Sequence, residues 1–209
     1  TLHHGDCLDI LPTLEAGSVD AVITDLPYGT TACSWDEVIP FAPMWAEVKR
    51  VLKPRGAFVT TASQPFTSKL IMSNLEWFKY CWYWDKVIGA NFLNLKNRPF
   101  KTCEEVCVFS DVADFVFNPL RVFRTNTSLQ RDPIGKSRTV PQKGDKAEYY
   151  GNFGRKMGIP ISKDGKKHPV DIIQFSTRES GVVYDVKHPT KKPVSLYKYL
   201  IRTYTNEGE

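Results

Sequence analysis

Hydrophobic and polar residues alternate along the first half of the chain in a way that predicts strands separated by helices. Residues 19–25, VDAVITD, form a short apolar run rich in β-branched side chains, which is typical of a strand in a parallel sheet. Trp45, Val48, Val51 and Leu52 recur at helical spacing before Pro54–Gly56, which predicts a helix with a stop. Further strands are predicted at 57–63, 79–87 and 103–110, and further helices at 66–75 and 191–205.

This order of elements predicts an α/β fold with a doubly wound, mostly parallel sheet, because helices of this length allow right-handed crossovers between strands. The strand at 103–110 is the exception, and it could pair antiparallel with its neighbour. Residues 1–117 are interpreted as the α/β core and 171–209 as a return to it. Residues 118–170 show little periodicity and are interpreted as an irregular insertion. The aromatic cluster at 77–84 is expected to pack in the core, with a role in base stacking as the alternative.

Composition favours one globular domain of 209 residues, 42% of them hydrophobic. No apolar run is long enough to span a membrane, and the first residues do not resemble a secretion signal, so we expect no membrane partner and a cytoplasmic location. The five cysteines are scattered among apolar residues, which favours reduced thiols over disulfides. Cys103 and Cys107 lack further ligands nearby, so no metal site is expected.

Positive charge is concentrated in the insertion. Residues 121–170 hold twelve Lys or Arg and four Asp or Glu, a balance of +8, whereas the whole chain carries +5. A polyanion is therefore a plausible partner for the insertion, which is our candidate for target recognition. The alternative is a solvated basic loop with no partner.

The segment Asp25-Leu26-Pro27-Tyr28 directly follows the predicted strand 19–25. Ligands of open α/β sheets lie at the carboxyl ends of strands. Pro27 favours an extended Leu26, whose main-chain carbonyl could then lie beside the Asp25 carboxylate and offer two acceptors to an amino group. Tyr28 offers a ring face to a base. An ordinary turn with a capping aspartate is the simpler interpretation of these four residues alone.

Three segments in the same order resemble the DNA amino-methyltransferases, in particular adenine-N6 enzymes of the β circular order from phage or restriction-modification systems. They are HHGDCLDILPTLEAGSVDAVITDLPYGT, LKPRGAFVTTASQPF and KHPTKKPVSLYKYLIRTYTNEGE. The resemblance implies the S-adenosylmethionine-dependent methyltransferase fold and methyl transfer to the N6 amine of an adenine flipped out of double-stranded DNA. It implies that Asp25 and the Leu26 carbonyl accept the amine hydrogens and that Tyr28 stacks on the base. The family usually has a second proline where this chain has Leu26, which costs rigidity but keeps the carbonyl.

The resemblance also suggests the residues that bind the cofactor, S-adenosylmethionine. They are Asp6, Cys7, Asp25, His188, Thr190 and Lys192. Asp6 could instead cap the helix that begins near Leu8, and the segment 188–193 could be a proline-rich lead to the last helix. A cation at Lys192 suits the methionine carboxylate.

Family members continue beyond the residue equivalent to Glu209 with a glycine-rich cofactor loop, which these 209 residues do not include. If Glu209 is the true end, we expect weak or absent cofactor binding. Two alternatives to the adenine enzyme stay open: a cytosine-N4 methyltransferase, in which the family tends to have Ser in place of Asp25, and a DNA-binding homologue without catalysis. A homodimer is left open as well.

Overall fold

The computed structural model describes residues 1–90, 95–123, 166–178 and 191–209. They belong to two units, of which one comprises Thr1–Asn118 with Val170–Glu209 and the other Pro119–Pro169. In its described part the second unit contains one antiparallel pair, β5 (Val122–Phe123) with β6 (Lys166–Lys167). Most of the basic insertion lies outside the described residues, so its role in DNA recognition stays a prediction.

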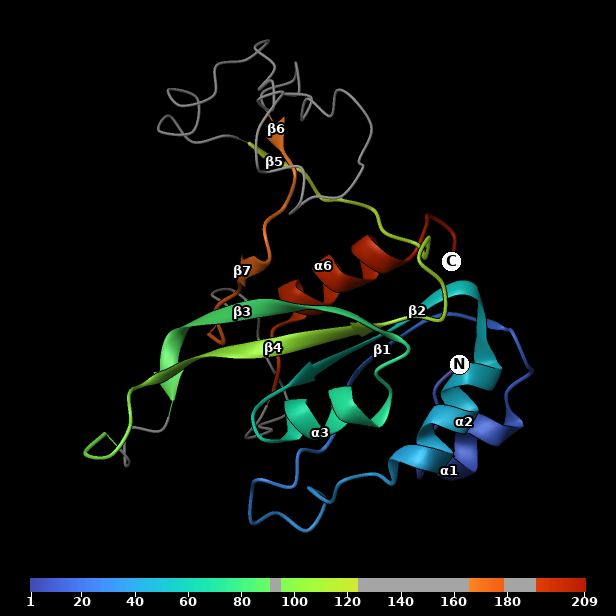
Figure 1. The fold of residues 1–209 in the computed structure, drawn as a ribbon, viewed down its shortest axis with the longest axis horizontal. Coiled ribbons are helices and arrows are strands. Elements are labelled where there is room, and N and C mark those ends of the chain that lie inside the picture. Colours follow the sequence, from blue (N-terminus) through green and yellow to red (C-terminus); the bar gives the residue numbers. More distant parts are fainter. Residues whose placement is uncertain (91–94, 124–165, 179–190) are drawn as a thin grey trace, which may run out of the picture. The chain divides into compact units, whose positions relative to one another are not determined.

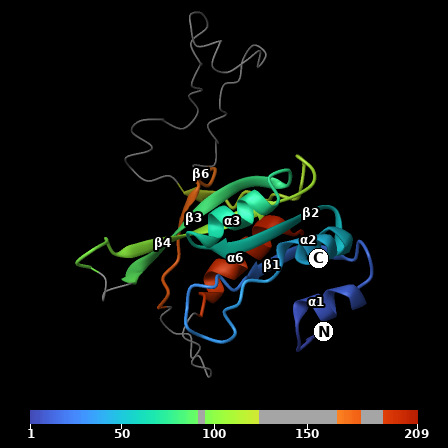
Figure 2. The same ribbon diagram turned by 60° about the horizontal axis from the view of Figure 1, so that its bottom comes forward.

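A five-stranded sheet forms the first unit, in the order β1-β2-β4-β3-β7 (Figure 1). The ends of β3 and β4 project together beyond the other strands (Figures 1 and 2). The strands are β1 (Val19–Asp25), β2 (Leu52–Ala62), β3 (Phe78–Ala90), β4 (Lys101–Phe109) and β7 (Ile172–Gln174).

The sheet is mixed, whereas the sequence predicts a mostly parallel one. β1 pairs parallel with β2, and β3 pairs parallel with β7. β4 pairs antiparallel with both β2 and β3. The physical reason is the short connection 91–100, since a parallel crossover from β3 to β4 would need a longer segment, usually with a helix. The antiparallel alternative for the strand at 103–110 is thereby confirmed, as is the α/β class.

Helices cover both faces of the sheet, as expected of a doubly wound fold. Figure 1 shows α6 on one face and the other helices on the opposite one. The helices are α1 (Cys7–Ile10), the short 3₁₀ helix η1 (Leu11–Thr13), α2 (Phe41–Val51), α3 (Phe66–Ser73) and α6 (Val194–Tyr204).

Two apolar clusters fill the two interfaces between helices and sheet. On the α2 and α3 side, Trp45 packs against Phe58 and Phe109 with ring centroids 4.9 and 5.0 Å apart. On the α6 side, the buried Tyr204 accepts a hydrogen bond from the Trp82 indole at 2.6 Å. The predicted core role of the aromatic segment is confirmed for Trp77, Trp82 and Trp84, whereas Tyr83, on the opposite face of β3, is 48% exposed.

The pairing of β1 with β2 contains an irregularity that the sequence predicts only in part. The register passes from Val19 opposite Leu52 to Ala21 opposite Ala57, so the residues between Leu52 and Ala57 bulge out of the ladder. Arg55 there has a positive φ of 69°. Pro54–Gly56 was predicted to separate the helix from the next strand, but these residues form a bulge inside β2, which already begins at Leu52. β1 is one of the two edge strands of the described sheet and only partly buried, although its apolar run is of the kind that is typical of strands covered on both faces.

Removal of side-chain volume at Leu200 tests the packing of α6 on the sheet. Leu200 is 1% exposed and Ile201, the next residue of α6, is 47% exposed. We expect Leu200→Ala to lower the free energy of unfolding by roughly 2–5 kcal/mol, since a buried cavity is created. Ile201→Ala is the control and should change it by less than about 0.5 kcal/mol. Urea denaturation followed by tryptophan fluorescence measures both, and equal effects would contradict the assigned burial.

Candidate active site

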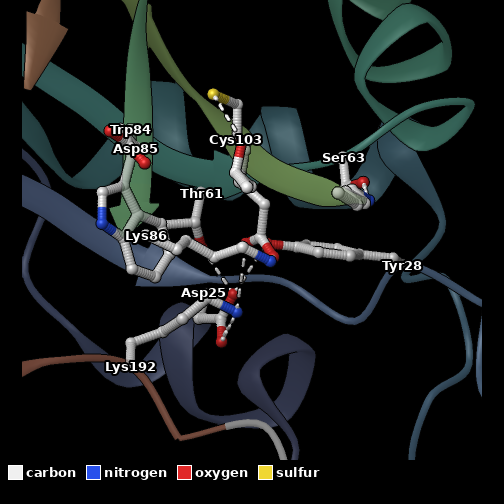
Figure 3. Close-up of polar contacts among 12 residues, drawn as sticks. Asp25, Tyr28, Thr61, Ser63, Trp84, Asp85, Lys86, Cys103 and Lys192 are labelled. Carbon is white, nitrogen blue, oxygen red and sulfur yellow. Dashed lines mark hydrogen bonds and ion pairs between the residues drawn. The ribbon is translucent and has the colours of Figure 1, made fainter. Parts of the chain in front are cut away.

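The end of β1 brings Asp25 beside β2. Asp25 is the last residue of β1, and its partner in the parallel ladder is Thr61. The Thr61 hydroxyl donates a hydrogen bond of 2.5 Å to Oδ1 of Asp25 (Figure 3). Parallel neighbours end at the same edge of a sheet, so this contact follows directly from the strand order. The predicted tetrad therefore lies where α/β sheets bind ligands.

Within the described part of the chain, the Asp25 carboxylate has three polar partners. Besides Thr61, the Tyr28 hydroxyl donates to Oδ1 at 3.0 Å, and the Lys192 ammonium forms an ion pair with Oδ2 at 3.0 Å. Figure 3 shows these side chains converging on the carboxylate. Burial raises the pKa of Tyr28 well above its usual range, and the Asp25 charge raises it further. The Tyr28 hydroxyl is thus held protonated and acts as a donor to Asp25.

Two side chains, Phe66 and Lys192, contact the Tyr28 ring in the described residues. Phe66 stacks on it with a centroid distance of 5.2 Å and an interplanar angle of 22°. The Lys192 ammonium lies over the ring, 5.3 Å from its centroid. The Leu26 side chain packs against the core, which fixes the chain between Asp25 and Tyr28. That the Leu26 carbonyl faces a substrate stays a prediction.

A family comparison decides what kind of protein carries this site. A DNA methylase family model (N6_N4_Mtase) matches residues 19–209, which include every element from β1 to α6. The chain belongs to the DNA methylase family. The resemblance of the three sequence segments to this family is thereby confirmed.

Two type II methyltransferases are similar to this DNA methylase chain in sequence. The type II methyltransferase M.HpaI of Haemophilus parainfluenzae is 27% identical over 98% of the chain, and the chain spans only 59% of that relative's length. The type II methyltransferase M1.MboII of Moraxella bovis is 25% identical over the whole chain, which covers 80% of it.

Solved structures show the same fold. The PvuII DNA methyltransferase, which is cytosine-N4-specific, superposes with a TM-score of 0.59 at 18% identity, over 97% of this chain and 69% of its own. M1.HpyAVI, solved as a complex with S-adenosylmethionine, gives a TM-score of 0.52 at 18% identity, over 98% of this chain and 76% of its own. At these identities the likeness establishes the methyltransferase fold of this chain.

The residues predicted to bind the cofactor are only partly described in this methylase. Oδ1 of Asp6 accepts a hydrogen bond of 2.8 Å from the Leu8 amide, so Asp6 caps α1 as the alternative interpretation expects. Burial raises the pKa of the neighbouring Cys7 thiol. Lys192 is described and lies at Asp25. His188 and Thr190 lie outside the described residues, and the cofactor role of the whole set stays a prediction.

Sequence reasoning missed two charged side chains next to the predicted site. Lys86 of β3 and Glu104 of β4 form an ion pair of 2.9 Å with side chains only 8% and 13% exposed. Oε2 of Glu104 lies 3.8 Å from the Lys192 ammonium. The sequence offered one signal for this pair, because both residues lie inside predicted strands. Lys and Glu are seldom buried unless they are paired, so a charged residue in a buried strand indicates a partner nearby.

Asp36 is a third residue that sequence reasoning missed. Its buried carboxylate accepts hydrogen bonds from the main-chain amides of Gly29, Thr30 and Thr31 at 2.7–2.9 Å. Gly29 adopts a positive φ of 66°, and a Cβ there would lie 2.9 Å from Val38. Asp36 therefore fixes the loop that directly follows Tyr28. An acidic residue a few positions after a glycine turn was the only sequence signal.

Two cysteines lie side by side on neighbouring strands of the sheet. Cys81 and Cys107 are direct partners of β3 and β4, and their sulfur atoms lie 3.6 Å apart as free thiols. In the described ranges there is no group of three or more His, Cys, Asp or Glu residues that could hold a metal ion.

The described helices also include none that is long and apolar enough to cross a membrane.

The pH dependence of stability tests the role of Asp36. Burial raises the pKa of Asp36, but the Thr31 hydroxyl and the three amides lower it more, to about 2 from an ordinary 3.8. The folded-state pKa is depressed, so the carboxylate stabilises the fold above about pH 4, and this stabilisation is lost as the pH falls towards 2. Asp36→Asn should lower the free energy of unfolding at pH 7 by roughly 1–3 kcal/mol and flatten its slope between pH 4 and 2.

Urea denaturation at a series of pH values measures this slope. Glu37→Gln is the matched control, because Glu37 is the adjacent acidic residue and is exposed. It should keep both the stability and the slope of the unchanged protein. An Asp36→Asn protein with an unaltered pH profile would show that Asp36 does not hold the loop.

Proposed function

We propose that the protein transfers a methyl group from S-adenosylmethionine to the N6 amine of an adenine in double-stranded DNA. The observation that carries this proposal is the Asp25 carboxylate at the end of β1, oriented by Thr61 and next to the Tyr28 ring. Membership of the DNA methylase family supports the reaction class. The names of the type II relatives support a place in restriction and modification of DNA.

The chemistry that this site must assist concerns a weak nucleophile. The lone pair of an adenine amine is delocalised into the ring, so its nitrogen must become pyramidal before it can attack. Asp25 and the adjacent Leu26 carbonyl would accept the two amine hydrogens, which favours the pyramidal nitrogen and stabilises its developing positive charge. Thr61 and Tyr28 both donate to Oδ1, which orients the carboxylate before the substrate arrives. The amine proton leaves after the transfer.

The target base must leave the duplex to reach this site. Extrusion of a paired base costs a few kcal/mol, which stacking against an aromatic ring can offset. Tyr28 would supply this ring, supported from the core by Phe66. Positive charge in residues 121–170 would attract the phosphate backbone. Double-stranded DNA is thus the proposed partner. A cytoplasmic location is part of the proposal. A homodimer stays an untested prediction.

The charged groups near Asp25 fit the proposed cofactor. S-adenosylmethionine carries a positive sulfonium and a negative carboxylate, and the site offers both carboxylates and an ammonium. Asp6, Cys7, Asp25 and Lys192 are the described residues that would hold it. When bound, the cofactor would supply a methyl group to the amine nitrogen, and its sulfonium sulfur would leave as a neutral thioether. Relatives of known structure include one solved as a complex with S-adenosylmethionine.

Cytosine-N4 methylation is the second candidate. The cytosine amine attached to C4 has the same two hydrogens and the same delocalised lone pair, so the geometry around Asp25 would serve it as well. The PvuII structure, which shares the fold, is cytosine-N4-specific by name. Asp25 favours adenine because the family tends to have Ser at this position for cytosine. A DNA-binding homologue without catalysis is the third candidate.

Nucleoside analysis separates the three candidates. Duplex DNA is incubated with the protein and S-adenosylmethionine, digested to nucleosides and analysed by mass spectrometry. We expect N6-methyladenine. N4-methylcytosine would establish the second candidate, and DNA binding in a gel-shift assay without any methylated base would favour the third.

Substitution of Asp25 tests its assigned role. Asp25→Ala should reduce methyl transfer by roughly a hundredfold or more, because it removes the main acceptor for the developing charge. Duplex affinity in a gel-shift assay should change little, since phosphate contacts dominate it. Asp20→Ala, at the other end of β1, removes only a partly exposed ion pair with Lys53 and should keep transfer. Near-normal transfer by Asp25→Ala would refute the assignment.

A further inference from the structure

Four charged side chains form a connected group at the proposed site. The Lys86 ammonium contacts Oε1 of Glu104 at 2.9 Å, and the Lys192 ammonium contacts Oδ2 of Asp25 at 3.0 Å. Lys86, Glu104 and Lys192 are each at most 13% exposed, and Asp25 is 31% exposed. The group contains two carboxylates and two ammonium groups, so its formal charges balance.

One atom of this group lacks a hydrogen bond. Among the described residues, Oε2 of Glu104 is buried and has no hydrogen-bond partner. The Lys192 ammonium lies 3.8 Å from this oxygen, which is beyond hydrogen-bond distance. A buried carboxylate oxygen without a partner is costly, so such an atom needs an explanation.

The present position of Lys192 conflicts with the proposed reaction. Its ammonium contacts Oδ2 of Asp25 and lies over the Tyr28 ring, as Figure 3 shows for Lys192 and Asp25. Oδ1 of Asp25 already accepts from the hydroxyls of Thr61 and Tyr28. An amine that binds between Asp25 and Tyr28 must therefore compete with Lys192 for both the carboxylate and the ring.

We propose that Glu104 is a positioning residue that receives Lys192 when the target amine reaches Asp25. This inference rests on the proposed function. A shift of the ammonium by about 1 Å would turn the 3.8 Å separation from Oε2 into a hydrogen bond. Lys192 then exchanges one carboxylate for another, so its ammonium stays paired, and the Asp25 carboxylate becomes available to the amine. Lys86 holds Oε1 of Glu104 and keeps the second acceptor in place.

The exchange has an electrostatic consequence for Asp25. While Lys192 is on Asp25, the ammonium neutralises the carboxylate. Once Lys192 is on Glu104, the negative charge of Asp25 faces the amine, whose nitrogen becomes positive during methyl transfer. Glu104 thus acts through Lys192 and touches no reacting atom.

Acylation of Lys192 in the protein alone tests whether Glu104 is the second acceptor. A water-soluble acetylating ester is used, and mass spectrometry follows the reaction rate at Lys192. In Asp25→Ala, Lys192 should stay protected because it moves to Glu104. In Asp25→Ala with Glu104→Gln, the rate should rise about fivefold or more, since the ammonium has lost both partners. The matched control is the double variant Asp25→Ala with Glu105→Gln. Its Lys192 should stay protected, because Glu105 instead accepts a hydrogen bond from the Thr67 hydroxyl.

Two results would overturn the inference in this assay. The first is that Lys192 reacts as fast in Asp25→Ala as in the double variant that also carries Glu104→Gln. The second is that Lys192 in the control, Asp25→Ala with Glu105→Gln, reacts as fast as in the double variant with Glu104→Gln. Glu104→Gln leaves the buried Lys86 unpaired and could unfold the protein. The same comparison is then made with Lys86→Met added, because replacing both members of a buried ion pair is better tolerated than removing one.

Methyl transfer tests whether the exchange matters for the reaction. Glu104→Gln should lower the single-turnover rate roughly tenfold or more, with duplex affinity within about twofold, because Lys192 then stays on Asp25. Glu105→Gln should transfer at the unchanged rate. An unchanged rate in Glu104→Gln would overturn the inference. If the unaltered protein transfers no methyl group at all, the proposed function fails, while the acylation assay still decides where Lys192 goes.

Discussion

The parallel pairing of β1 with β2 is the interaction on which the candidate site depends. It places Asp25 opposite Thr61, and the Thr61 hydroxyl fixes one carboxylate oxygen. Without this pairing, the tetrad would be an exposed loop with no defined geometry. The bulge in β2 belongs to the same constraint, because it sets which residue of β2 lies opposite Asp25.

The other side of the site depends on how α6 packs. Leu196, Leu200 and Tyr204 bury one face of this helix against the sheet, and Pro193 precedes its first residue. Lys192 is therefore attached directly to a helix whose position the core determines. A long side chain at the start of such a helix can reach Asp25 or Glu104 with small movements, because only its own rotatable bonds need to change.

Charge balance explains how a half-buried site can hold so many ionised groups. Each ammonium faces a carboxylate, so the cost of removing the charges from water is partly repaid. Asp36 follows another rule, since its partners are main-chain amides of the loop after Tyr28. The two arrangements have different consequences: the amides hold a loop still, whereas the paired side chains can exchange partners.

The sequence by itself determined the α/β class, most of the elements and the tetrad that follows β1. These features are local, because strand and helix periodicity and the position of Pro27 involve residues close together in the chain. It allowed an antiparallel pairing of β4 with a neighbour, but it did not reveal that β4 lies between β2 and β3. Only that strand order brings Thr61 and Glu104 to the same site, although 42 residues separate them in sequence. Tyr28 is a local partner of Asp25, but Thr61 and Lys192 come from β2 and from the segment before α6, so only the tertiary structure decided which charges and donors meet at this carboxylate.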